Sequence, residues 1–116
     1  MLLDCDSRWQ FSNLGTKLAA MYVGTIEVEV IIHAGRTLKD RRRTVESLKR
    51  QIRNSFNAAV ADLDGDPVPG HARIGVVCVA NEPQRLDAQL QVIVNFVEDS
   101  HLDLEVINAP VEIVQL

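Results

Sequence analysis

The sequence has few aromatic residues and only two cysteines. Aromatic side chains make up 4% of the 116 residues, and after residue 20 they are limited to Tyr22, Phe56 and Phe96. An RNA-recognition motif stacks bases on interleaved aromatic residues of its sheet, so that mode of RNA binding is excluded. Cys5 and Cys78 lack metal-ligand spacing. Cys78 lies in an apolar run and is expected to be a buried, reduced thiol, which fits a cytoplasmic protein.

Catalytic and metal-binding motifs are also missing. There is no G-x-S-x-G, no phosphate-binding Walker loop and no dinucleotide-binding glycine pattern. His33, His71 and His101 lie far apart without a ligand pattern. Residues 62–66 resemble the start of a calcium loop, but the required glycine and glutamate are out of position, which favours turn-forming aspartates. We therefore expect that the protein is not an enzyme and that it binds neither a cofactor nor a metal ion.

Long apolar runs are absent as well. No run approaches the roughly 18 residues of a membrane span, so no membrane association is expected. The first residues do not resemble a signal peptide, because Asp4 and Asp6 interrupt them and no basic region precedes them. Residues 1–20 show no clear period and are predicted to be a flexible N-terminal extension. Residues 21–116 are predicted to form one domain, long enough to bury a core.

The patterned part of the chain predicts an α+β fold. The periods predict strands over 22–32, 57–64, 72–80 and 104–108, a short terminal strand over 111–116, and helices over 37–53 and 81–99. Thr37 and Asn81 are the predicted N-caps, and Pro110 predicts an edge position or a bulge. The order β-α-β-β-α-β is that of a ferredoxin-like sandwich. Two helices would cover one face of a four-stranded antiparallel sheet whose first and third strands are central.

Apolar stripes predict which faces are buried. The stripes are Leu38, Val45, Leu48, Ile52 and Phe56 on the first helix, and Leu86, Leu90, Ile93 and Val97 on the second. The third strand is apolar on both sides, so one apolar set is left on the open face of the sheet. A second subunit could cover that face, which suggests a homodimer. A modest exposed patch, or cover by the N-terminal extension, is the alternative.

Positive charge is concentrated in the first helix. Residues 36–53 hold eight basic and two acidic residues, a local charge of +6, whereas the whole chain is at −4 and the remainder therefore carries −10. Such segregation favours an anionic partner. The candidate binding residues are Lys39, Arg41, Arg42, Arg43, Lys49, Arg50 and Arg53.

The positions of these cations add a second argument. Several crowd the first turns, where the helix dipole disfavours each cation by about 0.3–1 kcal/mol, so a use for them is expected. Free backbone N–H groups there would complete an anion site. The alternative is an ordinary solvated helix face, on which Glu46 pairs with Arg42, Lys49 and Arg50.

Several motifs resemble one known family. They are Tyr22-Val23-Gly24, Thr37-Leu38-Lys39-Asp40-Arg41-Arg42, Ser47-Leu48-Lys49, Phe56-Asn57 and Ala72-Arg73-Ile74-Gly75-Val76. Over residues 21–109 the chain resembles the YlxP-like family, a domain of unknown function, although its loop 65–70 has Pro-Val-Pro where similar proteins often have an aromatic residue. The resemblance implies a small cytosolic bacterial protein of ferredoxin-like fold. Because the family's genes often neighbour those for translation-initiation and ribosome-binding factors, it also implies a role in ribosome assembly or translation. It transfers no catalytic residue.

Two hypotheses follow. The first is a non-enzymatic RNA- or ribosome-associated factor in which the seven cations contact phosphates with little reading of bases. The alternative is a dimeric small-ligand-binding or regulatory module, with an anionic metabolite at the N-terminus of the first helix near residues 39–43. Catalytic activity is the third hypothesis, because the sequence shows no pair of residues suited to acid–base catalysis.

Overall fold

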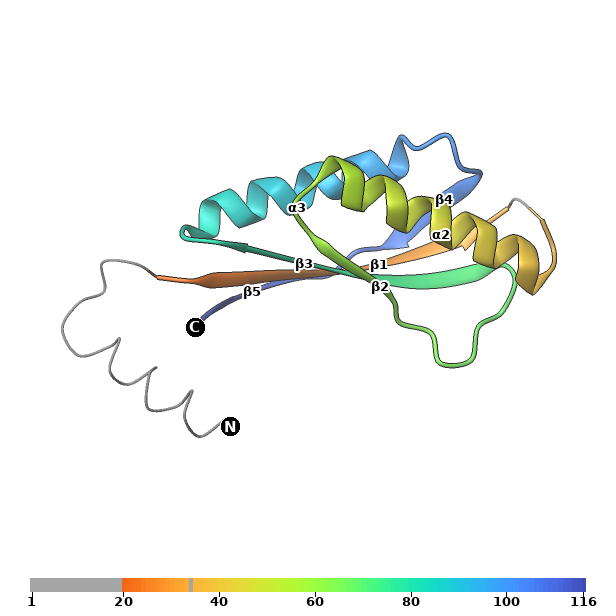
Figure 1. Ribbon diagram of the computed structural model, residues 1–116, viewed down its shortest axis with the longest axis horizontal. Helices are drawn as coiled ribbons and strands as arrows, with labels where there is room; N and C mark the ends of the chain where they lie inside the picture. Colours follow the sequence, from red (N-terminus) through yellow and green to blue (C-terminus); the bar gives the residue numbers. More distant parts are fainter. Residues whose placement is uncertain (1–19, 34) are drawn as a thin grey trace.

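The computed structural model describes residues 20–33 and 35–116, so the predicted N-terminal extension lies outside the described residues except for Ala20. The elements are β1 (Tyr22–Ile32), α2 (Leu38–Ser55), β2 (Ala59–Asp62), β3 (His71–Ala80), α3 (Pro83–Glu98), β4 (Leu104–Asn108) and β5 (Val111–Gln115). This order and the antiparallel sheet confirm the predicted ferredoxin-like α+β fold. Both helices lie on one face of the sheet (Figure 1).

The sheet has the order β2-β3-β1-β4, and β5 also pairs with β1. All of these pairings are antiparallel, and β1 and β3 are central as predicted. β4 pairs with one end of β1 and β5 with the other, with Pro110 between them and a register shift between Glu29 and Val30. The predicted irregularity at Pro110 is therefore confirmed, because proline cannot donate to the ladder. The outcome is an interrupted edge strand along β1.

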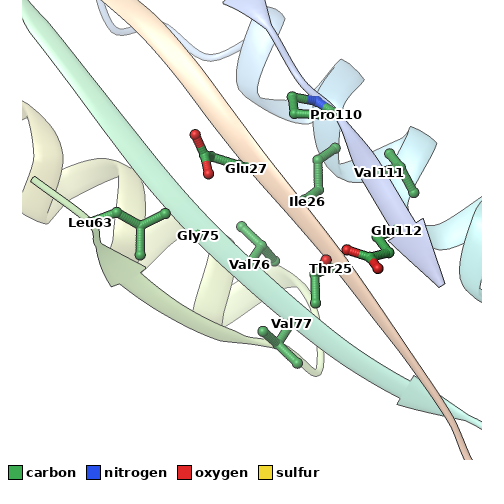
Figure 2. Close-up of a pocket in the computed structure, with 10 residues that line it drawn as sticks. All are labelled: Thr25, Ile26, Glu27, Leu63, Gly75, Val76, Val77, Pro110, Val111 and Glu112. Carbon is green, nitrogen blue, oxygen red and sulfur yellow. The ribbon is translucent and has the colours of Figure 1, made fainter. Parts of the chain in front are cut away.

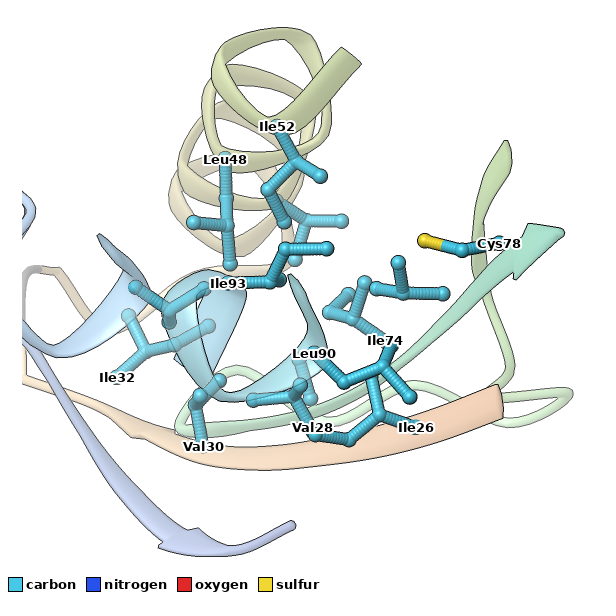
Figure 3. Close-up of a cluster of buried hydrophobic side chains, with 14 of the residues drawn as sticks. Ile26, Val28, Val30, Ile32, Leu48, Ile52, Ile74, Cys78, Leu90 and Ile93 are labelled. Carbon is cyan, nitrogen blue, oxygen red and sulfur yellow. The ribbon is translucent and has the colours of Figure 1, made fainter. Parts of the chain in front are cut away.

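The core lies between the sheet and the helices. Alternate residues of β1 and β3 meet the buried stripes of the two helices (Figure 3). The predicted stripe of α3 is confirmed, since all four side chains are fully buried. Burying one such side chain contributes about 1.5–3 kcal/mol. Within the described part of the chain, neither helix is long and apolar enough to cross a membrane.

Three local predictions are wrong. Leu38 is 52% exposed rather than buried, and it lines a surface hollow together with Pro67 of the β2–β3 connection. The N-cap of α3 is Glu82 and not Asn81, with Pro83 opening the helix. Finally, β2 ends at Asp62 instead of residue 64. The Asp62 carboxylate accepts a hydrogen bond from the backbone N–H two residues on, which is a turn that ends the strand.

Candidate nucleic-acid interface

Helix α2 begins with a well-defined cap. The Thr37 hydroxyl accepts a hydrogen bond from the Asp40 backbone N–H at 3.1 Å, and the Asp40 carboxylate accepts one from the Arg36 backbone N–H at 3.1 Å. The hydrogen bond from the Arg36 backbone N–H is the main cause that holds the pKa of the Asp40 carboxyl below its ordinary value, and the Thr37 side chain adds to the effect. Gly35 has φ 92°, and a Cβ there would collide with the Asp40 side chain. The Asp40 carboxylate therefore lies at the N-terminus of α2, where it interacts favourably with the helix dipole.

The basic flank of α2 is the main charged feature of the helix layer. We define the basic flank as Lys39, Arg42, Arg43, Lys49, Arg50 and Arg53, of which all but the half-buried Lys49 are exposed. Lys49 Nζ lies 3.3 Å from Glu46 Oε2. Among the residues that the structure describes, no carboxylate lies within 4.0 Å of the other five cations. At 1.5 Å per residue, the flank extends over roughly 21 Å.

Arg41 does not belong to this flank, which corrects its prediction as a phosphate ligand. Its side chain is only 4% exposed. The guanidinium donates to Asp62 Oδ2 at 2.9 Å and to Asp64 Oδ2 at 2.7 Å, and its Nε donates to the His71 carbonyl at 2.9 Å. With its donors engaged inside the protein, Arg41 is unavailable to an external phosphate.

Hydrogen bonds between Arg41 and Asp62 keep both side chains charged. The hydrogen bond to Asp62 raises the pKa of Arg41, against the opposing effect of burial. Burial acts to raise the pKa of Asp62, but the hydrogen bonds from Arg41 and from the Asp64 backbone outweigh it, so that the pKa of Asp62 is lowered. A charge-assisted bond of this kind is about twice as strong as a neutral one. Arg41 therefore clamps α2 to the connection between β2 and β3.

A signal for this clamp is present in the sequence. Arg41 precedes Val45, Leu48 and Ile52 at the spacing i, i+4, i+7, i+11, which places it in the buried stripe of α2 and not beside its basic neighbours. A cation in an apolar stripe requires an internal anion. The paired aspartates of the segment 62–64 supply it, although sequence reasoning assigned them only to a turn.

The described residues offer no evident metal centre, since they contain no group of three or more His, Cys, Asp or Glu side chains placed to hold an ion. Of the histidines, His71 contacts Glu29 (Nε2 to Oε2, 2.6 Å) and His33 contacts Glu105 at 3.5 Å. Cys78 is buried, as predicted, and burial raises the pKa of its thiol.

The fold and the basic flank define a small α+β protein with one cationic helix face. The chain belongs to the family described as "Protein of unknown function (DUF503)", whose model matches residues 23–111. It is similar to "Uncharacterized protein YlxP" of Bacillus subtilis (strain 168), with 23% identity over 83 residues, covering 72% of this chain and 89% of the relative. The chain is thus YlxP-like, in agreement with the resemblance of its motifs.

Proposed function

We propose that the protein is a non-enzymatic RNA- or ribosome-associated factor that binds phosphates through the basic flank of α2. The observation that supports this most directly is the row of exposed cations on one side of a single helix, five of them free of carboxylates from the described residues. We place this activity in ribosome assembly or translation in the cytoplasm.

The geometry of the flank suits a nucleic-acid backbone. Phosphates of one strand repeat about every 3.4 Å along a duplex, so roughly 21 Å of helix can meet several phosphates in succession. The flank carries flexible cations and no aromatic side chain, which favours contacts to phosphate over reading of bases. Arginine adds planar, bidentate contacts to phosphate oxygens.

A small anion at the N-terminus of α2 has less support. A hollow of about 260 Å³ does lie there, lined by Gly35, Asp40, Arg43 and Thr44. However, the Asp40 carboxylate already accepts the Arg36 backbone N–H and compensates the helix dipole. A bound anion would meet that negative charge, so the phosphate-tracking flank is the stronger candidate.

The test is binding to purified ribosomal subunits and to single-stranded RNA at increasing salt concentration. If all six cations contact phosphates, the logarithm of the association constant should fall against the logarithm of salt with a slope of about −4 for single-stranded RNA. Charge reversal by Arg42→Glu and Arg50→Glu should reduce co-sedimentation with the subunits, singly and more strongly together.

Arg85→Glu is the matched control, because Arg85 is an exposed arginine on α3 that pairs with Glu82 one turn away. It makes the same change of charge outside the basic flank and should leave binding unchanged. Equal losses for Arg85→Glu and Arg42→Glu would show only a response to total charge and would overturn the proposal. Binding that does not depend on salt would do the same.

A further inference from the structure

The open face of the sheet, opposite the helices, carries a groove of about 490 Å³. Its floor runs across β1 and β3, with Leu63 and Pro110 on opposite sides (Figure 2). We define the open-face groove by the residues that shape it: Thr25, Glu27, Leu63, Gly75, Val77, Pro110 and Glu112. The volume lies within the usual range for ligand pockets, about 300–1,000 Å³.

The floor is largely apolar because Leu63 and Val77 line it and Gly75 adds no polar side chain. Gly75 pairs with Glu27 on β1, and its neighbour Val77 pairs with Thr25. The Leu63 side chain leans over Gly75, since a Cβ there would lie 3.1 Å from both Leu63 Cδ atoms. The floor therefore consists mainly of the apolar surfaces of Leu63, which covers the half-buried Gly75, and of the 39% exposed Val77.

Two carboxylates border this floor. Glu112 on β5 pairs with Thr25 on β1. Glu27 lies two residues after Thr25, on the same face of β1, and pairs with Gly75. Arg73 Nε lies within ion-pair distance of Glu27 Oε2 and of Asp64 Oδ1, at 3.6 Å from each, but it forms no hydrogen bond with either among the described residues. Within the same part of the chain, no side chain donates a hydrogen bond to Glu27 or Glu112. Glu112 therefore has no cation within 4.0 Å among the described residues, and Glu27, although it faces Arg73, keeps its hydrogen-bond acceptor capacity for a ligand.

We propose that the open-face groove binds the lysine or arginine side chains of an extended, basic segment of a partner protein. The aliphatic stem of such a side chain would lie on Leu63 and Val77, and its cation would reach Glu112 or Glu27. Lysine and arginine combine an apolar stem with a charged tip, which matches an apolar floor with an acidic border. Binding at this groove is independent of RNA binding, because the groove is lined by β1 and β3 side chains that point away from the helices, whereas the basic flank lies on α2.

A second copy of this chain fits the groove less well. In a two-fold dimer the same surface meets itself, so apposed grooves would bring the Glu27 and Glu112 carboxylates of both copies together. A contact between the groove of one copy and the basic flank of another would be head-to-tail, which gives a ring or an open filament and not a two-fold dimer. Charge complementarity therefore favours a foreign basic segment.

The experiment is an NMR titration of ¹⁵N-labelled full-length protein with a capped peptide of alternating valine and lysine. We expect shifts in the amide signals of Thr25, Gly75 and Glu112, with those of α2 unchanged. A valine–glutamate peptide of equal length is the matched probe and should not bind. Glu27→Gln/Glu112→Gln should weaken binding of the lysine peptide about tenfold, because an exposed ion pair contributes roughly threefold in affinity.

Asp87→Asn/Glu98→Gln makes the same change of charge on α3 and should leave peptide affinity unchanged. Arg42→Glu should also leave it unchanged, which separates this test from that of RNA binding. Equal binding of the two peptides, or full affinity after Glu27→Gln/Glu112→Gln, would overturn the proposal. Spermine binding as tightly as the peptide would overturn its assignment to a protein segment. A dimer that buries this face in solution would also overturn it.

Discussion

Arg41 and Arg42 are neighbours on one helix and carry the same charge, yet the structure gives them opposite environments. Arg41 is buried and donates to two aspartates and a backbone carbonyl. Arg42 is exposed, and no carboxylate of the described residues lies within ion-pair distance. One residue along a helix turns a side chain by about 100°, which is enough to move a cation from the core stripe to the solvent face.

The comparison shows that a run of basic residues is not one functional unit. The cation that lies in the apolar stripe stabilises the fold by joining α2 to the β2–β3 connection. The cations of the basic flank add little to stability, because exposed charges interact weakly in water. A functional assignment should therefore follow burial and partners and not the count of charges.

Arg41→Met should produce the largest effect and tests the structural half of this comparison. It leaves Asp62 without its cation and leaves Asp64 with Arg73 alone at 3.6 Å. Because both carboxylates keep some contact with solvent, the loss should reach up to about 3 kcal/mol of unfolding free energy, the low end of the range for buried ion pairs. Urea denaturation measures this loss. Arg42→Met is the matched control and should stay within about 0.5 kcal/mol of the parent protein. Similar losses for both variants would contradict the distinction between the two arginines.

Arg42→Gln/Arg50→Gln tests the functional half. Removing two phosphate contacts should weaken RNA binding on the order of tenfold at low salt and make the salt slope shallower by about 1.4 for single-stranded RNA. Urea denaturation should show unchanged stability, since both side chains are exposed. If the variant loses stability but keeps its RNA affinity, the roles assigned to the two sides of α2 are reversed.

Thr37→Ala sharpens the comparison at the start of α2. It removes the hydroxyl that accepts the Asp40 backbone N–H, and loss of an N-cap costs about 1 kcal/mol. The effect should be smaller than that of Arg41→Met, because Arg41 still anchors the first turns to the sheet. Thr37→Ser keeps the cap and should recover most of the stability. If Thr37→Ala lowers the unfolding free energy as much as Arg41→Met, the N-cap and not Arg41 is the main contact that holds the start of α2.

Acid should produce the smallest effect that separates the two arginines. Because the pKa of Asp62 is lowered from 3.8 in the folded protein, its stabilisation is complete above that value and is lost as pH falls through the folded pKa. Unfolding free energies at pH 7 and pH 3 should therefore differ less in Arg41→Met than in Arg42→Met. The same pH dependence in both variants would contradict a stabilising interaction between Arg41 and ionised Asp62.

The elements with a strong local period were predictable. The alternation of β1, the buried stripe of α3 and the interruption at Pro110 all appear in the structure as expected. These features depend on the 2.0 and 3.6 residue periods and on the missing N–H of proline, which act within a few residues. Leu38 fits the same period but is exposed, in a surface hollow that Pro67 of the β2–β3 connection also lines.

By itself, the sequence determined the order of the elements, the buried faces and the positive charge of α2. Only the tertiary structure decided that Arg41 leaves the basic set, since its partners come from residues 62, 64 and 71. The open-face groove likewise needs β1, β3, β5 and the chain after β2 together. The physical reason is the distance along the chain over which each effect acts. Periodicity reports which side of an element is buried, whereas the partner of a buried charge and the shape of a surface depend on segments brought together by packing.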